Sequence, residues 1–334
     1  MRQRQSGTAV CQSPINRSEM KFFKTAVQRN QTSVSEFILQ GFSDLSWQLQ
    51  LFLFVFFLVI YIIALLGNSI IVFLATTSPS LHTPMYFFLG NFSFSEICYI
   101  STTVPKMLVN FLAKDKSMSF ISCAGQLYFF SVLGATDCFL LAIMAYDRYV
   151  AICRPLRYNI IMRWRLCIKL ATTSWIIGLM VAFGHTLFIF RLPFCGSNVI
   201  NHFFCDLPAV LKLACGNTYG SEVGVFLSGI FVAIIPCWLI LFSYARILGT
   251  ILRMHSVGRK QKTFSTCASH LTSVSLFFGT AISIYLRPNS SHSAESDRIL
   301  SLLYCVITPF LNPFIYTLKN KEVKGALKKL VGSK

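Results

Sequence analysis

Seven long apolar runs dominate the sequence, and short polar segments separate them. We place them near residues 50–76, 84–107, 121–153, 167–190, 222–250, 264–287 and 298–318. A helix needs about 20 apolar residues to cross a bilayer, so each run is long enough to span one. The pattern predicts an all-α membrane protein, with a seven-transmembrane helix bundle over residues 50–318 after a polar segment, 1–49.

The tail, residues 319–334, has the pattern of a short amphipathic helix. Val323, Ala326, Leu327, Leu330 and Val331 recur at helical spacing, and lysines lie between them. A basic helix with one apolar face lies in the membrane surface rather than crossing the membrane. The alternative for this segment is a disordered basic tail.

The distribution of charge predicts the orientation. The net charge is +18, and basic residues gather in segments 154–166 and 246–263, which hold no acid, and in the tail, where six lysines accompany only Glu322. Positive loops face the cytoplasm, so we expect a multi-pass plasma-membrane protein with an extracellular N-terminus. Asn30 begins an N-x-T glycosylation sequon in that segment.

Composition narrows the function. Hydrophobic residues make up 54% of the chain and charged residues 13%, about half the fraction typical of soluble domains. Because the basic charge lies in short segments between apolar runs, we expect it to meet anionic membrane lipids and a cytoplasmic protein, and no nucleic acid. The chain has no HExxH, GxSxG, phosphate-loop or CxxC motif, so we predict no enzyme, cofactor or metal site.

Two acids, Glu96 and Asp137, fall in the middle of the second and third runs, and Asn68 lies inside the first. Ionisable residues inside a membrane span are candidates for function. If the two acids face each other, repulsion keeps one protonated or recruits a cation such as sodium. The alternatives are two acids that bond separately to neighbouring hydroxyl or amide groups, or an ion or solute transporter or channel that uses both.

The third run ends in MAYDRYVAIC, with Asp147, Arg148 and Tyr149 at the membrane edge. A charged pair there needs partners or water. The simplest use is a latch that holds Arg148 in one state and frees it in another. The alternative is an interfacial anchor whose charged end reaches water.

The last run ends in Asn312-Pro313-Phe314-Ile315-Tyr316. Proline weakens the local helix hydrogen bonding, and Asn312 and Tyr316 offer polar contacts on either side of it. We interpret this stretch as a hinge that faces the bundle. The alternative is a plain proline kink.

Four cysteines, Cys123, Cys195, Cys205 and Cys215, fall on the predicted outer side, in an oxidising compartment. Four cysteines allow three pairings, and their spacing does not choose among them. Any disulfide between them would hold the long loop of residues 191–221 over the bundle.

Taken in order, these motifs resemble the rhodopsin-like G-protein-coupled receptors and, among them, the olfactory receptors. The resemblance covers roughly residues 30–325. It is carried by LLGNSIIV (65–72), LHTPMYFFLGNFSFSEICY (81–99), MAYDRYVAIC (144–153), SY (243–244), KTFSTCASHL (262–271) and PFLNPFIYTLKNKEVK (309–324).

This resemblance implies an odorant receptor that activates a heterotrimeric, stimulatory olfactory-type G protein and raises cyclic AMP. It also implies the disulfides Cys123–Cys205 and Cys195–Cys215, and glycosylation at Asn30. The residues that it assigns to coupling and activation are Asp147, Arg148, Tyr149, Tyr244, His270, Asn312, Pro313 and Tyr316.

The resemblance also implies a ligand pocket between the outer halves of the third, fifth and sixth spans. Its expected lining is Phe130, Ser131, Gly134, Ala135, Ser228, Gly229, Val232, Phe278, Ala281, Ile282 and Tyr285. This set contains no charged group, so we expect small, neutral, largely apolar odorants rather than amines. Phe278 stands where many relatives carry tyrosine, which removes one hydroxyl.

Overall fold

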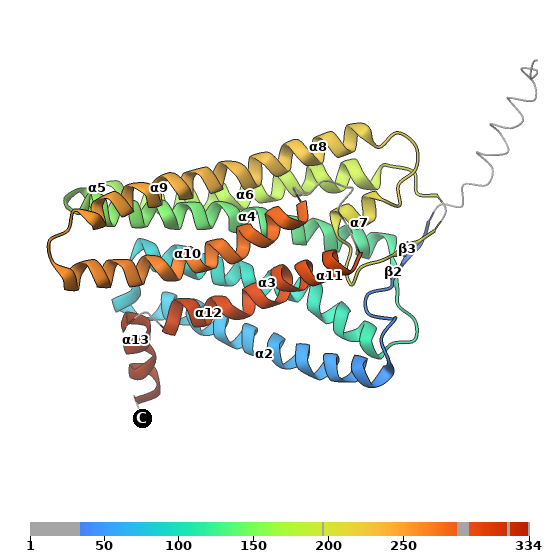
Figure 1. Cartoon of the computed structure of the whole chain (residues 1–334), viewed down its shortest axis with the longest axis horizontal. Coiled ribbons are helices and arrows are strands. Elements are labelled where there is room, and N and C mark those ends of the chain that lie inside the picture. Colours follow the sequence, from blue (N-terminus) through green and yellow to red (C-terminus); the bar gives the residue numbers. More distant parts are fainter. Residues whose placement is uncertain (1–33, 196, 286–293, 319–320, 333–334) are drawn as a thin grey trace, which may run out of the picture.

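A computed structural model describes residues 34–195, 197–285, 294–318 and 321–332. Asn30 lies outside these residues. The helices of the first four rods are α2 (Trp47–Thr77), α3 (Pro84–Leu112), α4 (Phe120–Cys153) and α6 (Trp164–Phe190). They run side by side along the length of the molecule (Figure 1).

The other rods are built in sections. The fifth comprises α8 (Tyr219–Gly229), the π-helical η3 (Ile230–Ile234) and α9 (Ile235–Leu252). The sixth is α10 (Val257–Tyr285), and the seventh comprises α11 (Ala294–Leu302), the π-helical η5 (Leu303–Ile307) and α12 (Thr308–Leu318). A final helix, α13 (Lys321–Gly332), turns away from the bundle at the end opposite the sheet (Figure 1).

Seven rods therefore form the bundle that the apolar runs predict. Within the described residues, six helices are long and apolar enough to cross a membrane. The remaining rod, α3, has 29 residues and packs against α2 and α4. At 1.5 Å per residue it is about 44 Å long, enough to cross a bilayer despite its polar Glu96 and Lys106.

Close approach of the helices depends on glycine at two positions. A Cβ atom on Gly67 of α2 would lie 2.8 Å from Cβ of Pro313 on α12. A Cβ atom on Gly178 of α6 would lie 2.6 Å from the carbonyl oxygen of Val132 on α4. Without a solvent-driven hydrophobic effect inside the bilayer, such small residues allow the tight packing that holds spans together.

The fifth rod packs less tightly at its outer end. None of the residues of α8 is buried, whereas α9 buries Pro236, Ile240, Ser243, Tyr244, Ile247 and Ile251. The inner half of the rod is therefore anchored in the bundle, and the outer half leaves space between itself and α4.

Short elements connect the rods. On the inner side these are η1 (Pro79–Leu81), η2 (Pro155–Arg157) and α5 (Tyr158–Ile161). On the outer side, α7 (Leu207–Leu211) is capped by the preceding residue, Asp206, whose carboxylate accepts a hydrogen bond from the backbone N–H of Leu207 at 2.8 Å.

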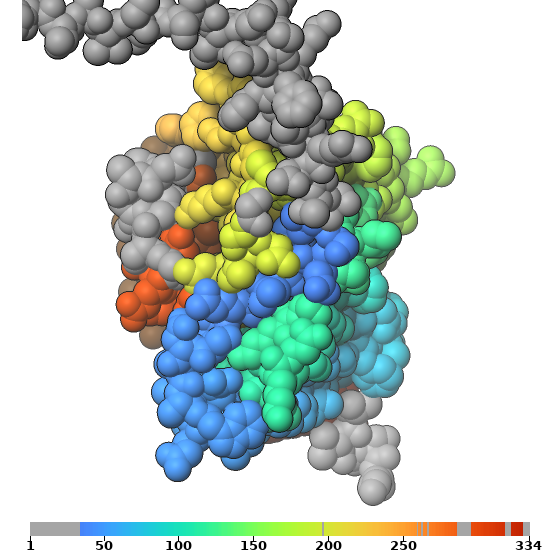
Figure 2. All heavy atoms as spheres, turned by 90° about the vertical axis from the view of Figure 1, so that its right-hand side faces the viewer, coloured from blue at the N-terminus to red at the C-terminus, as the bar shows by residue number. Residues whose placement is uncertain are grey.

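A three-stranded sheet covers part of the outer end. Strand β1 (Glu36–Leu39) lies between β2 (Ser117–Ser119), to which it is antiparallel, and β3 (Val199–Ile200), to which it is parallel. Figure 2 shows the corresponding blue, green and yellow-green segments gathered at this end. We call residues 34–45, 113–119 and 191–218 the outer cover.

Two disulfides hold the outer cover. Cys123, at the start of α4, is joined to Cys205, and both residues are fully buried. Cys195 is joined to Cys215 within the loop itself. The pairing that spacing alone left open is therefore the one that the resemblance implies.

Candidate ligand-binding and coupling sites

The large cavity of the molecule lies toward the outer end of the bundle and has a volume of about 840 Å³. It lies among α4, α6, α7, α8, η3, α10 and η5. The residues expected from the sequence that line it are Phe130, Ser131, Gly134, Ala135, Gly229, Val232, Ala281 and Tyr285. Its size suits an organic ligand, since ligand pockets commonly measure about 300–1,000 Å³.

Three expected contacts, Ser228, Phe278 and Ile282, are not among the lining residues. The Ser228 hydroxyl instead forms a hydrogen bond with the His185 imidazole of α6. Phe278 is buried, and its ring lies edge-on against that of Phe277. Helical periodicity can indicate that these residues face the inside of the bundle. It cannot say which of them are covered by neighbouring side chains and so do not line the cavity.

The cavity also has a wall and a rim that sequence reasoning missed. Val181 and His185 of α6 line one side, and Tyr304 of η5 lines another. His185 had a sequence signal, because it is a polar residue inside an apolar run. The rim carries two charged residues, Lys212 and Glu222, in contrast to the uncharged lining expected from the sequence.

Asp206 belongs to the outer cover and is almost fully buried. Its carboxylate accepts hydrogen bonds from the Tyr285 hydroxyl at 3.0 Å and from the backbone N–H of Leu207 at 2.8 Å. Burial raises the pKa of this carboxyl group to about 6, although both hydrogen bonds act to lower it. The contact connects the loop before α7 to the outer end of α10.

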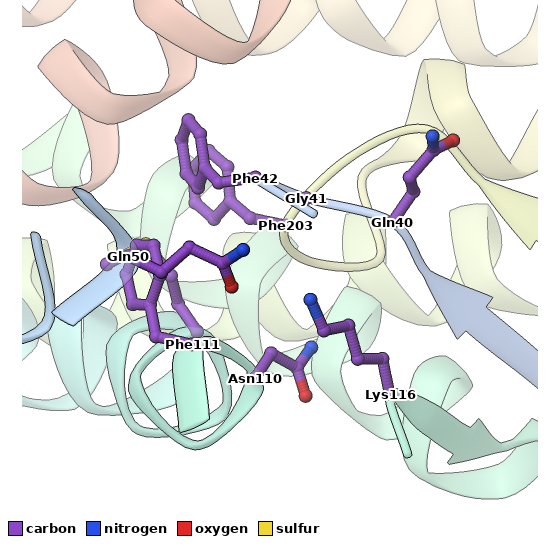
Figure 3. A pocket seen from close by; sticks show the side chains of 9 residues that line it. Gln40, Gly41, Phe42, Gln50, Asn110, Phe111, Lys116 and Phe203 are labelled. Atoms are coloured by element: carbon purple, nitrogen blue, oxygen red, sulfur yellow. The ribbon is translucent and has the colours of Figure 1, made fainter. Parts of the chain in front are cut away.

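A second cavity, of about 10 Å³, lies under the outer cover beside Phe42 and Phe111 (Figure 3). Both polar side-chain atoms of Asn110 are buried there without a hydrogen-bond partner. A space of this size holds about one water molecule, so it is too small for an odorant.

The predicted polar site at mid-span is a chain of hydrogen bonds across three rods. Ser273 of α10 donates to the Asn312 carbonyl oxygen at 2.8 Å, and the Asn312 amide donates to the Glu96 carboxylate of α3 at 2.7 Å. Asn68 donates to the Pro309 carbonyl oxygen at 3.1 Å. Asn312 thus joins the hinge segment to α3 and α10.

Asp137 lies close enough to Glu96 for the two carboxyl groups to interact electrostatically. Both of its carboxylate oxygens are buried and lack a hydrogen-bond partner. Among the described residues, no cluster of three or more histidine, cysteine, aspartate or glutamate side chains could hold a metal ion.

At the inner end of α4, Asp147 is buried, and its carboxylate accepts a hydrogen bond from the Tyr158 hydroxyl of α5 at 2.8 Å. In the part of the chain that the structure describes, Asp147 and Arg148 form no ion pair. The Nε atom of Arg148 is buried without a partner. Tyr149 is half-buried and packs against the core.

Two more of the predicted coupling residues form a pair between α9 and α10. The hydroxyl of Tyr244 and Nδ1 of His270 are hydrogen-bonded at 2.8 Å, and the two rings are stacked. Tyr316 of α12 lies edge-on against Phe92 of α3, with ring centroids 6.4 Å apart. The predicted coupling residues thus form separate contacts that connect α9 to α10 and α12 to α3.

These features define a class. Seven membrane-spanning rods, a ligand-sized cavity near one end and the sequence Asp147-Arg148-Tyr149 at the other are the architecture of a G-protein-coupled receptor.

Comparison with known proteins assigns the family within this class. The family model described as "Olfactory receptor" matches residues 57–334. Human olfactory receptor 10A5 is 52% identical over 298 residues, which is 89% of this chain and 94% of that protein. Human olfactory receptor 10A7 is 50% identical over 91% of this chain and 96% of its own length.

Mouse olfactory receptor 2B6 is 49% identical over 90% of this chain and 96% of its own length. The chain belongs to the olfactory receptor family, whose members are receptors and not enzymes. It is therefore a multi-pass membrane protein of a family that binds odorants and couples to G proteins.

Proposed function

We propose that this receptor binds small, neutral, largely apolar volatile ligands in the 840 Å³ cavity, and that binding activates a stimulatory olfactory-type G protein to raise cyclic AMP. The observation that carries the proposal is the cavity itself. Aromatic and aliphatic side chains, among them Phe130, Val232 and Ala281, form most of its inner wall.

The chemistry of the wall determines the class of ligand. Burial of apolar area contributes about 25 cal/mol per Å², so a compact hydrocarbon skeleton gains most of its affinity from the wall. Ser131 and Tyr285 supply hydroxyl groups that can meet one polar atom of the ligand. Lys212 and Glu222 have opposite charges and lie at the exposed rim, so together they favour neither ligand charge.

Coupling takes place at the opposite end of the bundle. Arg148 is the cation that we expect to meet the G protein, with Tyr244, His270 and Tyr316 in the contacts that rearrange when a ligand binds. The basic segments of the inner side also attract anionic lipids of the inner leaflet. In this proposal the receptor lies in the plasma membrane with its inner end facing the cytoplasm. The N-terminus is then extracellular and carries a glycan on Asn30.

A cyclic AMP reporter screen against odorant mixtures tests the proposal. Once a ligand is found, Arg148→Ala should abolish the response while surface expression stays measurable. Ala281→Leu should weaken the response to bulky ligands more than to small ones, because the added side chain occupies part of the cavity. A full response from Arg148→Ala would exclude the assigned role of that residue.

The alternative function, an ion or solute transporter or channel, relies on Glu96 and Asp137. It predicts current or solute uptake in vesicles that contain no G protein. The Asn312–Glu96 hydrogen bond gives Glu96 a structural partner within the bundle, which favours the receptor.

A further inference from the structure

A hydrogen bond joins the last helix to the inner end of α3. The hydroxyl of Tyr86 donates to Oε2 of Glu322 at 2.7 Å, across 236 residues of sequence. Tyr86 is buried, whereas Glu322 is exposed and lies in the first turn of α13. The bond therefore connects an element of the core to an element of the cytoplasmic surface.

The surroundings favour a carboxylate at this position. Tyr86 is the third residue of α3 and Glu322 the second of α13, so the carboxylate lies beside the first turns of two helices. Helix N-termini carry partial positive charge and stabilise nearby acids. Lys324, Lys328 and Lys329 are exposed on the same helix, and the acid Glu322 forms the hydrogen bond to Tyr86 of the bundle.

The rest of α13 supports the same placement. Val323 and Ala326 are buried, and the helix packs against η1, α2 and α12. This apolar face keeps α13 near the bundle, but apolar contacts are not directional. A charge-assisted hydrogen bond has a defined geometry and can set the rotation and position of the helix along α3.

The corner between α12 and α13 is thus attached to α3 at two points. Tyr316 packs against Phe92, and four residues after α12 ends, Glu322 bonds to Tyr86. Tyr86 and Phe92 are six residues apart on α3, or about 9 Å along its axis. Movement of this corner requires at least one of the two contacts to change.

We propose that Tyr86 and Glu322 are positioning residues for G-protein coupling. Their hydrogen bond holds α13 and the end of α12 where the receptor presents its inner face to the G protein. The inference rests on the proposed function, because it assigns a role in coupling to residues outside the ligand cavity and outside the Asp147-Arg148-Tyr149 sequence.

The test uses the full-length receptor in lipid nanodiscs with a purified stimulatory heterotrimer and a saturating odorant from the screen. Tyr86→Phe and Glu322→Ala should each slow GDP release by about tenfold or more, since tenfold is near the lower end of what a hydrogen bond to a charged group contributes. The double variant should lose less than the sum of the two single losses, because both changes remove the same Tyr86–Glu322 hydrogen bond. Glu322→Gln keeps an acceptor and should retain most of the rate, and odorant affinity should not change.

Tyr61→Phe is the matched control. The Tyr61 hydroxyl is hydrogen-bonded to Ser101 between α2 and α3 at 3.1 Å, and Tyr61 lies in a different rod from the proposed pair. The Tyr61→Phe variant loses a phenolic hydroxyl, as Tyr86→Phe does, and should leave GDP release at the wild-type rate. Wild-type GDP release in Tyr86→Phe, or additive losses in the double variant, would overturn the proposal.

A second measurement does not depend on an odorant. A fluorescent amino acid in place of Lys328 reports the mobility of α13 through its anisotropy. Tyr86→Phe and Glu322→Ala should lower that anisotropy, and unchanged anisotropy would overturn the proposed positioning. If no odorant makes the wild type release GDP, the proposed receptor function fails, while the anisotropy still decides whether this bond positions α13.

Discussion

Several polar residues of this receptor are buried in contacts that give each of them a structural role. Asp147 bonds to Tyr158, Tyr244 to His270, and Asn312 to both Ser273 and Glu96. Each pair joins two different helices, so a change in one partner is transmitted to another rod. At this scale the chemistry of single side chains predicts measurable effects.

The Asp206 carboxyl group should make stability depend on pH. Its pKa of about 6 lies above the usual 3.8, so protonation favours the folded state. This stabilisation is present in full below about pH 4 and is lost as the pH rises through 6; the shift corresponds to about 3 kcal/mol. The apparent melting temperature of the wild type should therefore fall between pH 5 and pH 7.5.

Asp206→Asn provides the comparison, because its amide oxygen can still accept from Tyr285 and Leu207 but cannot titrate. The fall in melting temperature over this pH range should be several degrees smaller in the variant. The other charged groups that act on Asp206 are Asp297 and Lys212. Equal pH profiles for the two proteins would mean that Asp206 titrates as an exposed residue.

At the scale of the elements, glycine residues determine how closely the backbones of two helices can approach. Gly178 brings α6 against α4, whereas Gly184, six residues further along α6, has open space around it. Both glycines lie in the same helix, so replacing either by alanine changes helix propensity in the same way. A difference between the two variants therefore reports the effect of packing.

Gly178→Ala should reduce thermal stability and surface expression, because the new methyl group would lie 2.6 Å from the Val132 carbonyl oxygen and would force α4 and α6 apart. Gly184→Ala makes the same chemical change in open space and should be neutral or stabilising, by up to about 1 kcal/mol. Melting of the purified proteins in detergent measures both. Equal effects at the two sites would show that the α4–α6 approach is not tight.

Long periodic elements were predictable from the sequence, and short ones were not. The first run, predicted at 50–76, is the helix Trp47–Thr77, because this predominantly apolar run is long enough to cross a bilayer, where a helix satisfies its own backbone hydrogen bonds. The strands β1, β2 and β3 have two to four residues and carry no recognisable period. The sheet exists because distant segments meet over the bundle, which a local pattern cannot reveal.

The proposed ligand cavity shows the same limit. Positions such as Phe130, Ala135 and Tyr285 line the cavity as the resemblance implied, since they lie on helices whose register the motifs determine. Lys212 and Val181 were missed because their contribution depends on where α7 and α6 lie relative to α8. Ser228 was expected in the lining, but its hydroxyl bonds to His185, a partner more than 40 residues away.

Taken as a whole, the receptor has a covalently fastened outer end and an inner end held by hydrogen bonds and packing. Both disulfides lie in or beside the outer cover, whereas contacts such as Tyr86–Glu322 and Tyr158–Asp147 connect elements at the inner end. Hydrogen bonds exchange more readily than disulfides. We therefore expect the outer cover to keep its shape when a ligand binds, and the movements proposed for coupling to occur at the inner end.

The two disulfides should contribute unequally to this asymmetry. Cys123–Cys205 joins α4 to the outer cover and is completely buried, and it closes a loop of 82 residues. Cys195–Cys215 closes a loop of 20 residues inside the cover, and Cys195 is exposed. Replacing Cys123 and Cys205 together by serine buries two hydroxyl groups and releases the cover from α4, so surface expression should fall severely.

The paired replacement of Cys195 and Cys215 by serine is the matched control, since it removes one disulfide from the same cover and leaves the link to α4 intact. It should lower surface expression less, and the receptor that reaches the surface should keep its response to the ligand. Flow cytometry of intact cells with an N-terminal epitope tag, followed by the cyclic AMP assay, measures both outcomes. If the two double variants lose expression equally, the outer cover folds as one unit, and its attachment to α4 is no more important than its internal disulfide.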